Sequence, residues 1–81
     1  MTVAVRLFAR ARELAGRDVI RLDLPPGATV GTLRLELAAV VPALSTLLAR
    51  SALAVNNEFA DDAQPLPPEA EVALLPPVSG G

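Results

Sequence analysis

The sequence contains no cysteine, histidine, lysine, tyrosine or tryptophan, and its only aromatic residues are Phe8 and Phe59. Without cysteine, the chain can form no disulfide and has no side-chain thiolate for nucleophilic attack or for carrying a persulfide. Without histidine, it lacks the commonest acid–base group near neutral pH and the commonest transition-metal ligand. Missing lysine also excludes Schiff-base chemistry on a side chain. We therefore expect no catalytic residue, no metal site, no bound cofactor and no independent enzyme activity.

The charge and hydropathy patterns exclude two further classes of partner. The net charge is −2, and the seven arginines are scattered along the 81 residues. Nucleic-acid binding would need a basic stripe and aromatic residues for base stacking, so we expect no nucleic-acid partner. No apolar run is long enough to cross a membrane, and Arg6 follows too few residues for a secretory signal. The sequence predicts one cytoplasmic domain with no membrane association, and its 52% apolar content suffices for a core.

The C-terminal end has the composition of an extended tail. Residues 72–75 are apolar and bounded by proline, which is typical of a short buried strand. Pro76 and Pro77 cannot donate ladder hydrogen bonds, so we expect the strand to stop there and the chain to continue extended. Val78 and Ser79 follow, and Gly80 and Gly81 then narrow the tail to bare backbone. We assign residues 1–75 to the folded domain and 76–81 to a tail that suits insertion into another protein; the alternative is a frayed terminus.

Two periodicities predict the secondary structure. Large aliphatic residues recur at every second position within residues 2–8 and 19–24, which indicates strands. A hairpin is expected over 53–60 with Asn56 and Asn57 in its turn. Good helix formers fill residues 9–15, with Gly16 as the expected C-terminal cap. Thr29 is expected to cap a helix that runs to about residue 41, where Pro42 ends it. Its apolar stripe is predicted to comprise Val30, Leu33, Leu37, Val40 and Val41.

The order of these elements is strand, short helix, strand, long helix, hairpin, surface crossing over 61–70, and a closing strand over 71–75. This order favours an α+β fold of the β-grasp, ubiquitin-like type, in which a mixed sheet wraps around one main helix. The alternative is a ferredoxin-like split βαβ fold, which requires a second long helix. Residues 43–51 are a weak candidate for that helix. No internal repeat or second domain is indicated.

Strand parity predicts a docking face on the side of the sheet away from the helix. If Val5, Leu7, Val72 and Leu74 face the core, their neighbours face outward. Phe8, Leu75 and Phe59 would then form an apolar patch beside the tail, of the kind that marks protein interfaces. The alternative is that these are isolated exposed apolar residues, which are ordinary on protein surfaces.

Three segments together resemble the small, sulfur-carrier subunits of molybdopterin synthase. Residues 7–16, Leu-Phe-Ala-Arg-Ala-Arg-Glu-Leu-Ala-Gly, are similar to that family's first strand and short Arg-Glu helix. Residues 54–56 resemble its central strand and turn, and the ending Pro-Pro-Val-Ser-Gly-Gly over 76–81 is the most specific match. The chain departs from the family at Leu74 and Leu75, where aromatic residues are common.

The resemblance implies a mechanism centred on Gly81. An E1-like adenylyltransferase would use ATP to form an acyl-adenylate at this glycine, and sulfur from a persulfide donor would displace AMP to leave a thiocarboxylate. The tail, from Pro76 to Gly80, would then insert into the large catalytic subunit of the synthase. There the thiocarboxylate would donate sulfur to cyclic pyranopterin monophosphate in molybdenum cofactor biosynthesis. The family assembles as a heterotetramer of two large and two small subunits, and the small subunit is a non-catalytic carrier.

The resemblance also places Phe8, Arg12, Phe59 and Leu75 where the family contacts its partners; for Arg12 the alternative is a solvated helix charge. Two other functions remain open at this point. The chain could be a sulfur carrier of another pathway, such as thiamine, cysteine or tRNA thiolation. It could instead be a ubiquitin-like protein modifier or a non-covalent binding module.

Overall fold

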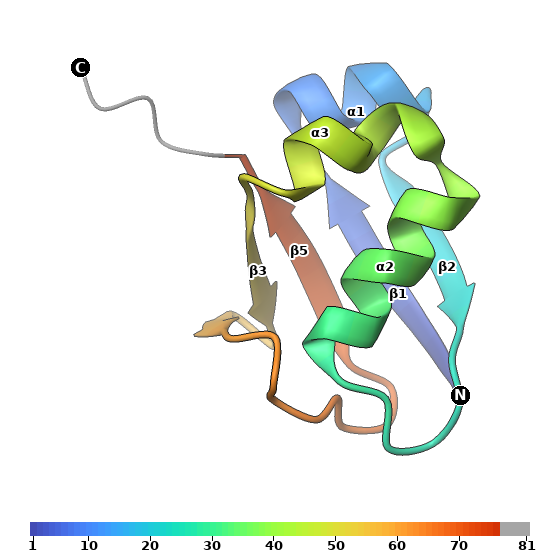
Figure 1. The fold of residues 1–81 in the computed structure, drawn as a ribbon, viewed down its shortest axis with the longest axis vertical. Coiled ribbons are helices and arrows are strands. Elements are labelled where there is room, and N and C mark those ends of the chain that lie inside the picture. The colour runs from blue at the N-terminus through green and yellow to red at the C-terminus, as the bar shows by residue number, and fades with distance from the viewer. Residues whose placement is uncertain (77–81) are drawn as a thin grey trace.

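The computed structural model describes residues 1–76. The segments with alternating patterns form strands of a sheet, and the segments with helical patterns form short helices (Figure 1). The elements in chain order are β1 (Thr2–Leu7), α1 (Ala9–Ala15), β2 (Val19–Asp23), α2 (Val30–Val40), the 3-10 helix η1 (Pro42–Leu44), α3 (Ser45–Leu48), β3 (Ala52–Val55), β4 (Glu58–Ala60) and β5 (Glu71–Leu75). Among these residues no helix is both long enough and apolar enough to cross a bilayer.

The five strands form one mixed sheet in the order β2-β1-β5-β3-β4. The central strands β1 and β5 run parallel, and the other neighbouring pairs are antiparallel. Helix α2 covers one face of this sheet (Figure 1), so the predicted β-grasp architecture is confirmed. The ferredoxin-like alternative does not fit, because residues 43–51 form only the end of η1 and the four-residue α3.

The core lies between α2 and the sheet, as strand parity predicts. Val5, Leu7, Val72 and Leu74 are at most 1% exposed, and the α2 side chains that meet them, Val30, Leu33 and Leu37, are fully buried. Burying a leucine or valine side chain stabilises a fold by about 1.5–3 kcal/mol. This packing is therefore the main source of stability.

The prediction that Val40 belongs to the apolar stripe of α2 is wrong, because Val40 is 50% exposed. The helix ends at Val40, and the non-helical backbone of Val41 turns the chain toward η1. Leu44 and Leu48 come from η1 and α3 and are buried at that end of the core. Together with the partly buried Val41, these two leucines supply the apolar side chains that follow α2 in the core.

Local signals in the sequence fix the turns as expected. Thr29 Oγ1 accepts a hydrogen bond from the backbone N–H of Thr32 at 3.2 Å, which caps α2. Gly16 adopts a φ of 74° and caps α1, a conformation that glycine allows at little cost. Asn56 and Asn57 adopt φ values of 49° and 71° between β3 and β4, so this turn has the positive-φ geometry that favours a tight hairpin.

The crossing over residues 61–70 is tied to the first turn of α2. The backbone N–H of Gly31 donates to the carbonyl of Asp62 at 2.9 Å. A Cβ added at Gly31 would lie 3.2 Å from that same oxygen and 3.3 Å from the Asp62 Cβ. The glycine is therefore explained by the close approach of the crossing segment. Leu66 and Ala70 in this segment are also buried.

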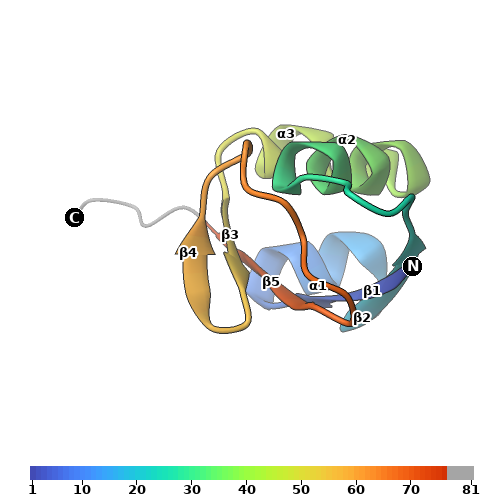
Figure 2. The same ribbon diagram turned by 90° about the horizontal axis from the view of Figure 1, so that it is seen from below.

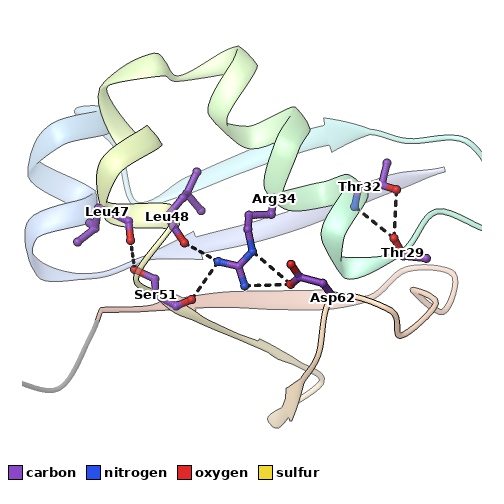
Figure 3. A network of polar contacts seen from close by, with 7 residues as sticks. All are labelled: Thr29, Thr32, Arg34, Leu47, Leu48, Ser51 and Asp62. Carbon is purple, nitrogen blue, oxygen red and sulfur yellow. Dashed lines mark hydrogen bonds and ion pairs between the residues drawn. The ribbon is translucent and has the colours of Figure 1, made fainter.

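Arg34 connects α2 to two other segments of the chain (Figure 3). Its Nε and Nη2 donate to Asp62 Oδ1 at 3.2 and 3.1 Å. Its Nη1 donates to the carbonyl of Ser51 at 3.0 Å and also to the carbonyl of Leu48. The Ser51 hydroxyl in turn donates to the Leu47 carbonyl at 2.6 Å. This network anchors the turn between α3 and β3 and the crossing segment to the main helix.

We expect Arg34→Met to lower the free energy of unfolding by about 1–3 kcal/mol, because two carbonyls of the α3–β3 turn lose a charged donor. Equilibrium urea unfolding measures this as a shift of the midpoint. Arg21→Met is the matched control, since Arg21 is exposed on β2 and forms no ion pair among residues 1–76. Equal midpoints for Arg34→Met and the control would contradict a stabilising role for the network.

Candidate protein interface

The last described residues leave the sheet from its central region. Leu74 lies beside Leu7 of β1 on one side and Leu53 of β3 on the other. Leu75 pairs with Ala52, and the half-buried Pro76 follows it outside any strand. Because β1 and β5 are parallel, β5 ends at the same end of the sheet as the start of α1 (Figure 1). Hydrogen bonding to neighbours on both sides makes this a firm attachment point for the predicted tail.

The face of the sheet away from α2 carries small side chains at its centre, Ala54 and Ala73, which we call the alanine floor. Figure 2 shows α2 and α3 together on the other side of the sheet. Ala73 of β5 pairs with Ala54 of β3, and Ala54 pairs with Phe59 of β4. Directly opposed residues in a sheet present their side chains on the same face. Phe59 is 76% exposed, so a large apolar ring stands at the edge of this alanine floor.

Phe8 and Leu75 lie at the other side of the same floor. Phe8 has an extended backbone, with φ −129° and ψ 155°, before α1 begins. Alternation therefore turns Phe8 away from the buried Leu7, and 45% of Phe8 is exposed. Leu75 is half-buried on the neighbouring strand. The structure thus gives Phe8, Leu75 and Phe59 a common face, with β5 and β3 between the two phenylalanines. We call these three residues with Ala54 and Ala73 the apolar face.

Arg12 lies one helical turn after Phe8. Its backbone N–H donates to the Phe8 carbonyl at 3.4 Å, and its side chain is exposed without an ion pair among residues 1–76. Arg6 is also on the outer face, and its Nη2 lies 3.9 Å from Glu71 Oε1. A surface ion pair of this kind contributes little to stability. Arg12 is therefore a charged group beside the apolar face. Whether Phe8, Arg12, Phe59 and Leu75 contact partners stays a prediction.

The remaining predicted site residues lie outside the described part of the chain. They are Pro77, Val78, Ser79, Gly80 and Gly81. Within residues 1–76, no group of three or more acidic side chains is arranged to hold a metal ion. Sequence reasoning missed the alanine floor, because the pairing of Ala54 with Phe59 depends on the register of the hairpin.

Solved structures define the class of protein. SAMP1 from Haloferax volcanii superposes with a TM-score of 0.88 at 32% sequence identity, covering 100% of both chains. A protein–protein complex of subunits 1 and 2 of the molybdopterin-converting factor from Helicobacter pylori contains a chain that matches with a TM-score of 0.71 at 27% identity, again over 100% of both chains. Together with the sheet order, these likenesses define a ubiquitin-like β-grasp protein.

Sequence comparison defines the family. The ThiS family model matches residues 5–81. A protein of Arabidopsis thaliana named molybdopterin synthase sulfur carrier subunit is 38% identical over 79 residues, which cover 98% of this chain and 82% of the relative. The chain therefore belongs to the ThiS family, and the resemblance to molybdopterin synthase small subunits is confirmed.

Proposed function

We propose that this chain is the sulfur carrier subunit of a molybdopterin synthase and that Gly81 carries the sulfur as a thiocarboxylate. The observation that supports this most strongly is the 38% identity to a molybdopterin synthase sulfur carrier subunit over 98% of the chain. The absence of cysteine agrees with it. A carrier without a thiol side chain needs another group for reactive sulfur, and a terminal carboxylate can take that role.

The carboxylate of Gly81 must be activated before sulfur can replace its oxygen, because a carboxylate is a poor electrophile. An E1-like adenylyltransferase would catalyse attack of a Gly81 carboxylate oxygen on the α-phosphorus of ATP, releasing pyrophosphate and forming an acyl-adenylate. Sulfur from a persulfide donor would then attack the acyl carbon. AMP leaves, and reductive cleavage of the sulfur–sulfur bond by a thiol leaves the thiocarboxylate. This chain binds no ATP in the scheme; the nucleotide belongs to the activating partner.

The loaded tail would next enter the large catalytic subunit. There the thiocarboxylate would donate sulfur to cyclic pyranopterin monophosphate, and two such transfers would build the dithiolene of molybdopterin. The known complex of subunits 1 and 2 of the Helicobacter pylori factor supports a large-subunit partner. We propose a heterotetramer of two large and two small subunits, with Phe8, Arg12, Phe59 and Leu75 in the contact and no catalytic residue from this chain.

A second candidate function is protein modification. SAMP1 of Haloferax volcanii, a small archaeal modifier protein, is 32% identical over the whole chain. Modification and sulfur transfer share the first step, activation of a terminal glycine. They differ in the acceptor, since a modifier forms an amide with lysines of other proteins whereas a carrier delivers sulfur.

A reconstitution experiment separates these candidates. The chain is incubated with the E1-like partner, ATP and a persulfide donor, then with the large subunit and cyclic pyranopterin monophosphate. Formation of the dithiolene, detected as an oxidised fluorescent derivative, is the expected result. Peptide mass spectrometry of the same mixture and of cell extracts tests for an amide between Gly81 and lysines of other proteins. Arg50 is the last basic residue of the chain, so trypsin would leave residues 51–81 attached to each modified lysine. Conjugates without dithiolene formation would make the modifier the correct function.

A further inference from the structure

A groove of about 300 Å³ lies beside α1 at the end of the sheet where β5 ends. It forms because α1 packs against η1, while α3 continues from η1 along the same side. We call it the arginine groove, and its lining residues are Arg10 and Leu14 from α1, Ala43 from η1, Thr46 and Leu47 from α3, and Arg50 after α3. The apolar face does not include any of these residues.

The arginine groove combines an apolar floor with two cationic side chains. Leu14 and Leu47 are half-buried and pack against the core. Arg10 Nη1 lies 3.6 Å from Glu13 Oε2, and the two side chains are 67% and 71% exposed. Such exposed ion pairs contribute little to stability. Arg50 forms no ion pair among residues 1–76. Both guanidinium groups are therefore available to a ligand.

The charge of this end of the molecule is opposite to the charge of the whole chain. The chain carries a net charge of −2. Around the groove and α1, however, arginines outnumber acidic residues: they are Arg10, Arg12, Arg17 and Arg50 against Glu13 and Asp18. Asp23, Glu58, Glu69 and Glu71 lie at the other end, where β2 ends and β5 begins. This asymmetry favours an acidic ligand at the groove end.

We propose that the arginine groove binds an acidic segment of the large subunit, with an apolar side chain of that segment on the Leu14–Leu47 floor and its carboxylates on Arg10 and Arg50. The inference rests on the proposed function. A protein that receives the tail must face the end of the sheet where β5 stops, and the groove lies at that end. Arginine–carboxylate pairs with bidentate geometry would orient the carrier while its tail enters.

The test is calorimetric titration of the full-length chain into the large subunit at low and high ionic strength. Arg50→Glu and Arg10→Glu are each expected to weaken binding about tenfold or more at low salt, with a smaller loss at high salt, because salt screens exposed charges. Arg21→Glu makes the same change of charge on β2 and is expected to bind within about twofold of wild type. Thr46→Trp fills the groove without changing charge and is expected to weaken binding at both salt concentrations. Urea unfolding of each variant verifies the fold.

The outcomes separate this inference from the proposed function. Wild-type binding with unchanged affinity for Arg10→Glu, Arg50→Glu and Thr46→Trp would overturn the groove assignment alone. Equal losses of affinity for Arg50→Glu and Arg21→Glu would show that only the net charge of the chain matters. That result would also overturn the groove assignment. The same variants are also titrated into the E1-like partner. A loss of affinity for that partner, with unchanged affinity for the large subunit, would contradict the assignment of the groove to the large subunit. Absence of wild-type binding to the large subunit would overturn the groove assignment and the proposed function together.

Discussion

Deletion of Gly81 is expected to abolish adenylation of the chain by its E1-like partner, with a loss of at least about 100-fold. The reacting carboxylate moves back by one residue, about 3.5 Å along an extended chain, and a misplacement of about 1 Å can already cost 100-fold in rate. ATP–pyrophosphate exchange catalysed by the partner measures this step without any sulfur donor. Among residues 1–76, the last core residue is Leu74 and the last sheet residue is Leu75, so we expect an unchanged unfolding midpoint.

Ser79→Thr is the matched control for that deletion. It keeps the length of the tail, and threonine is expected at this position in the family that the chain resembles. We expect exchange within about twofold of wild type, since the backbone that leads to the carboxylate keeps its length. Exchange at the wild-type rate after deletion of Gly81 would contradict the role of this residue.

Leu75→Glu is expected to weaken binding to the large subunit about 30-fold or more, which corresponds to the 2 kcal/mol or more of an interface hot spot. Leu75 is half-buried at the end of β5, beside the position of Phe8 and on the same face as the alanine floor. In the complex, a carboxylate at this position would lose its water without gaining a cationic partner, and burying an unpaired charge costs several kcal/mol. Phe59→Ser removes the exposed ring at the other side of the floor and is expected to act in the same direction. Calorimetric titration gives both affinities.

Val40→Glu is the control for this pair of variants. Val40 is an exposed apolar residue, like Phe59, but it ends α2 and lies on the helix-covered side of the sheet. We expect it to bind the large subunit within about twofold of wild type, because scattered exposed apolar residues carry no special role. If Leu75→Glu and Phe59→Ser both bind like Val40→Glu, the apolar face is not the docking surface.

The sequence predicts most of the fold because its signals are local. Period-two alternation fixes which residues of β1 and β5 face the core, and the capping residues Thr29 and Gly16 mark helix ends. Val40 shows where such patterns fail: its helical spacing is correct, but the backbone turns at Val41 and other leucines fill the core. A turn of this kind depends on tertiary packing, which helical periodicity does not report.

The candidate site divides in the same way. Parity alone places Phe8 and Leu75 on one face, whereas the position of Phe59 over Ala54 requires the register of the hairpin. The arginine groove could not be predicted, because it forms between α1 and a segment whose structure the sequence left ambiguous. The Arg34 network is likewise not visible in the sequence pattern. The contact of Arg34 with Asp62 depends on how the crossing segment folds back over α2.

The most direct test of the proposed function is the intact mass of the chain after incubation with ATP, the E1-like partner and a persulfide donor. We expect a gain that matches the replacement of one oxygen by sulfur, located by fragmentation at Gly81 and absent when ATP is withheld. Loss of this gain on addition of the large subunit and cyclic pyranopterin monophosphate would follow from sulfur transfer. An unchanged mass, with a partner shown to be active on another carrier, would contradict the account.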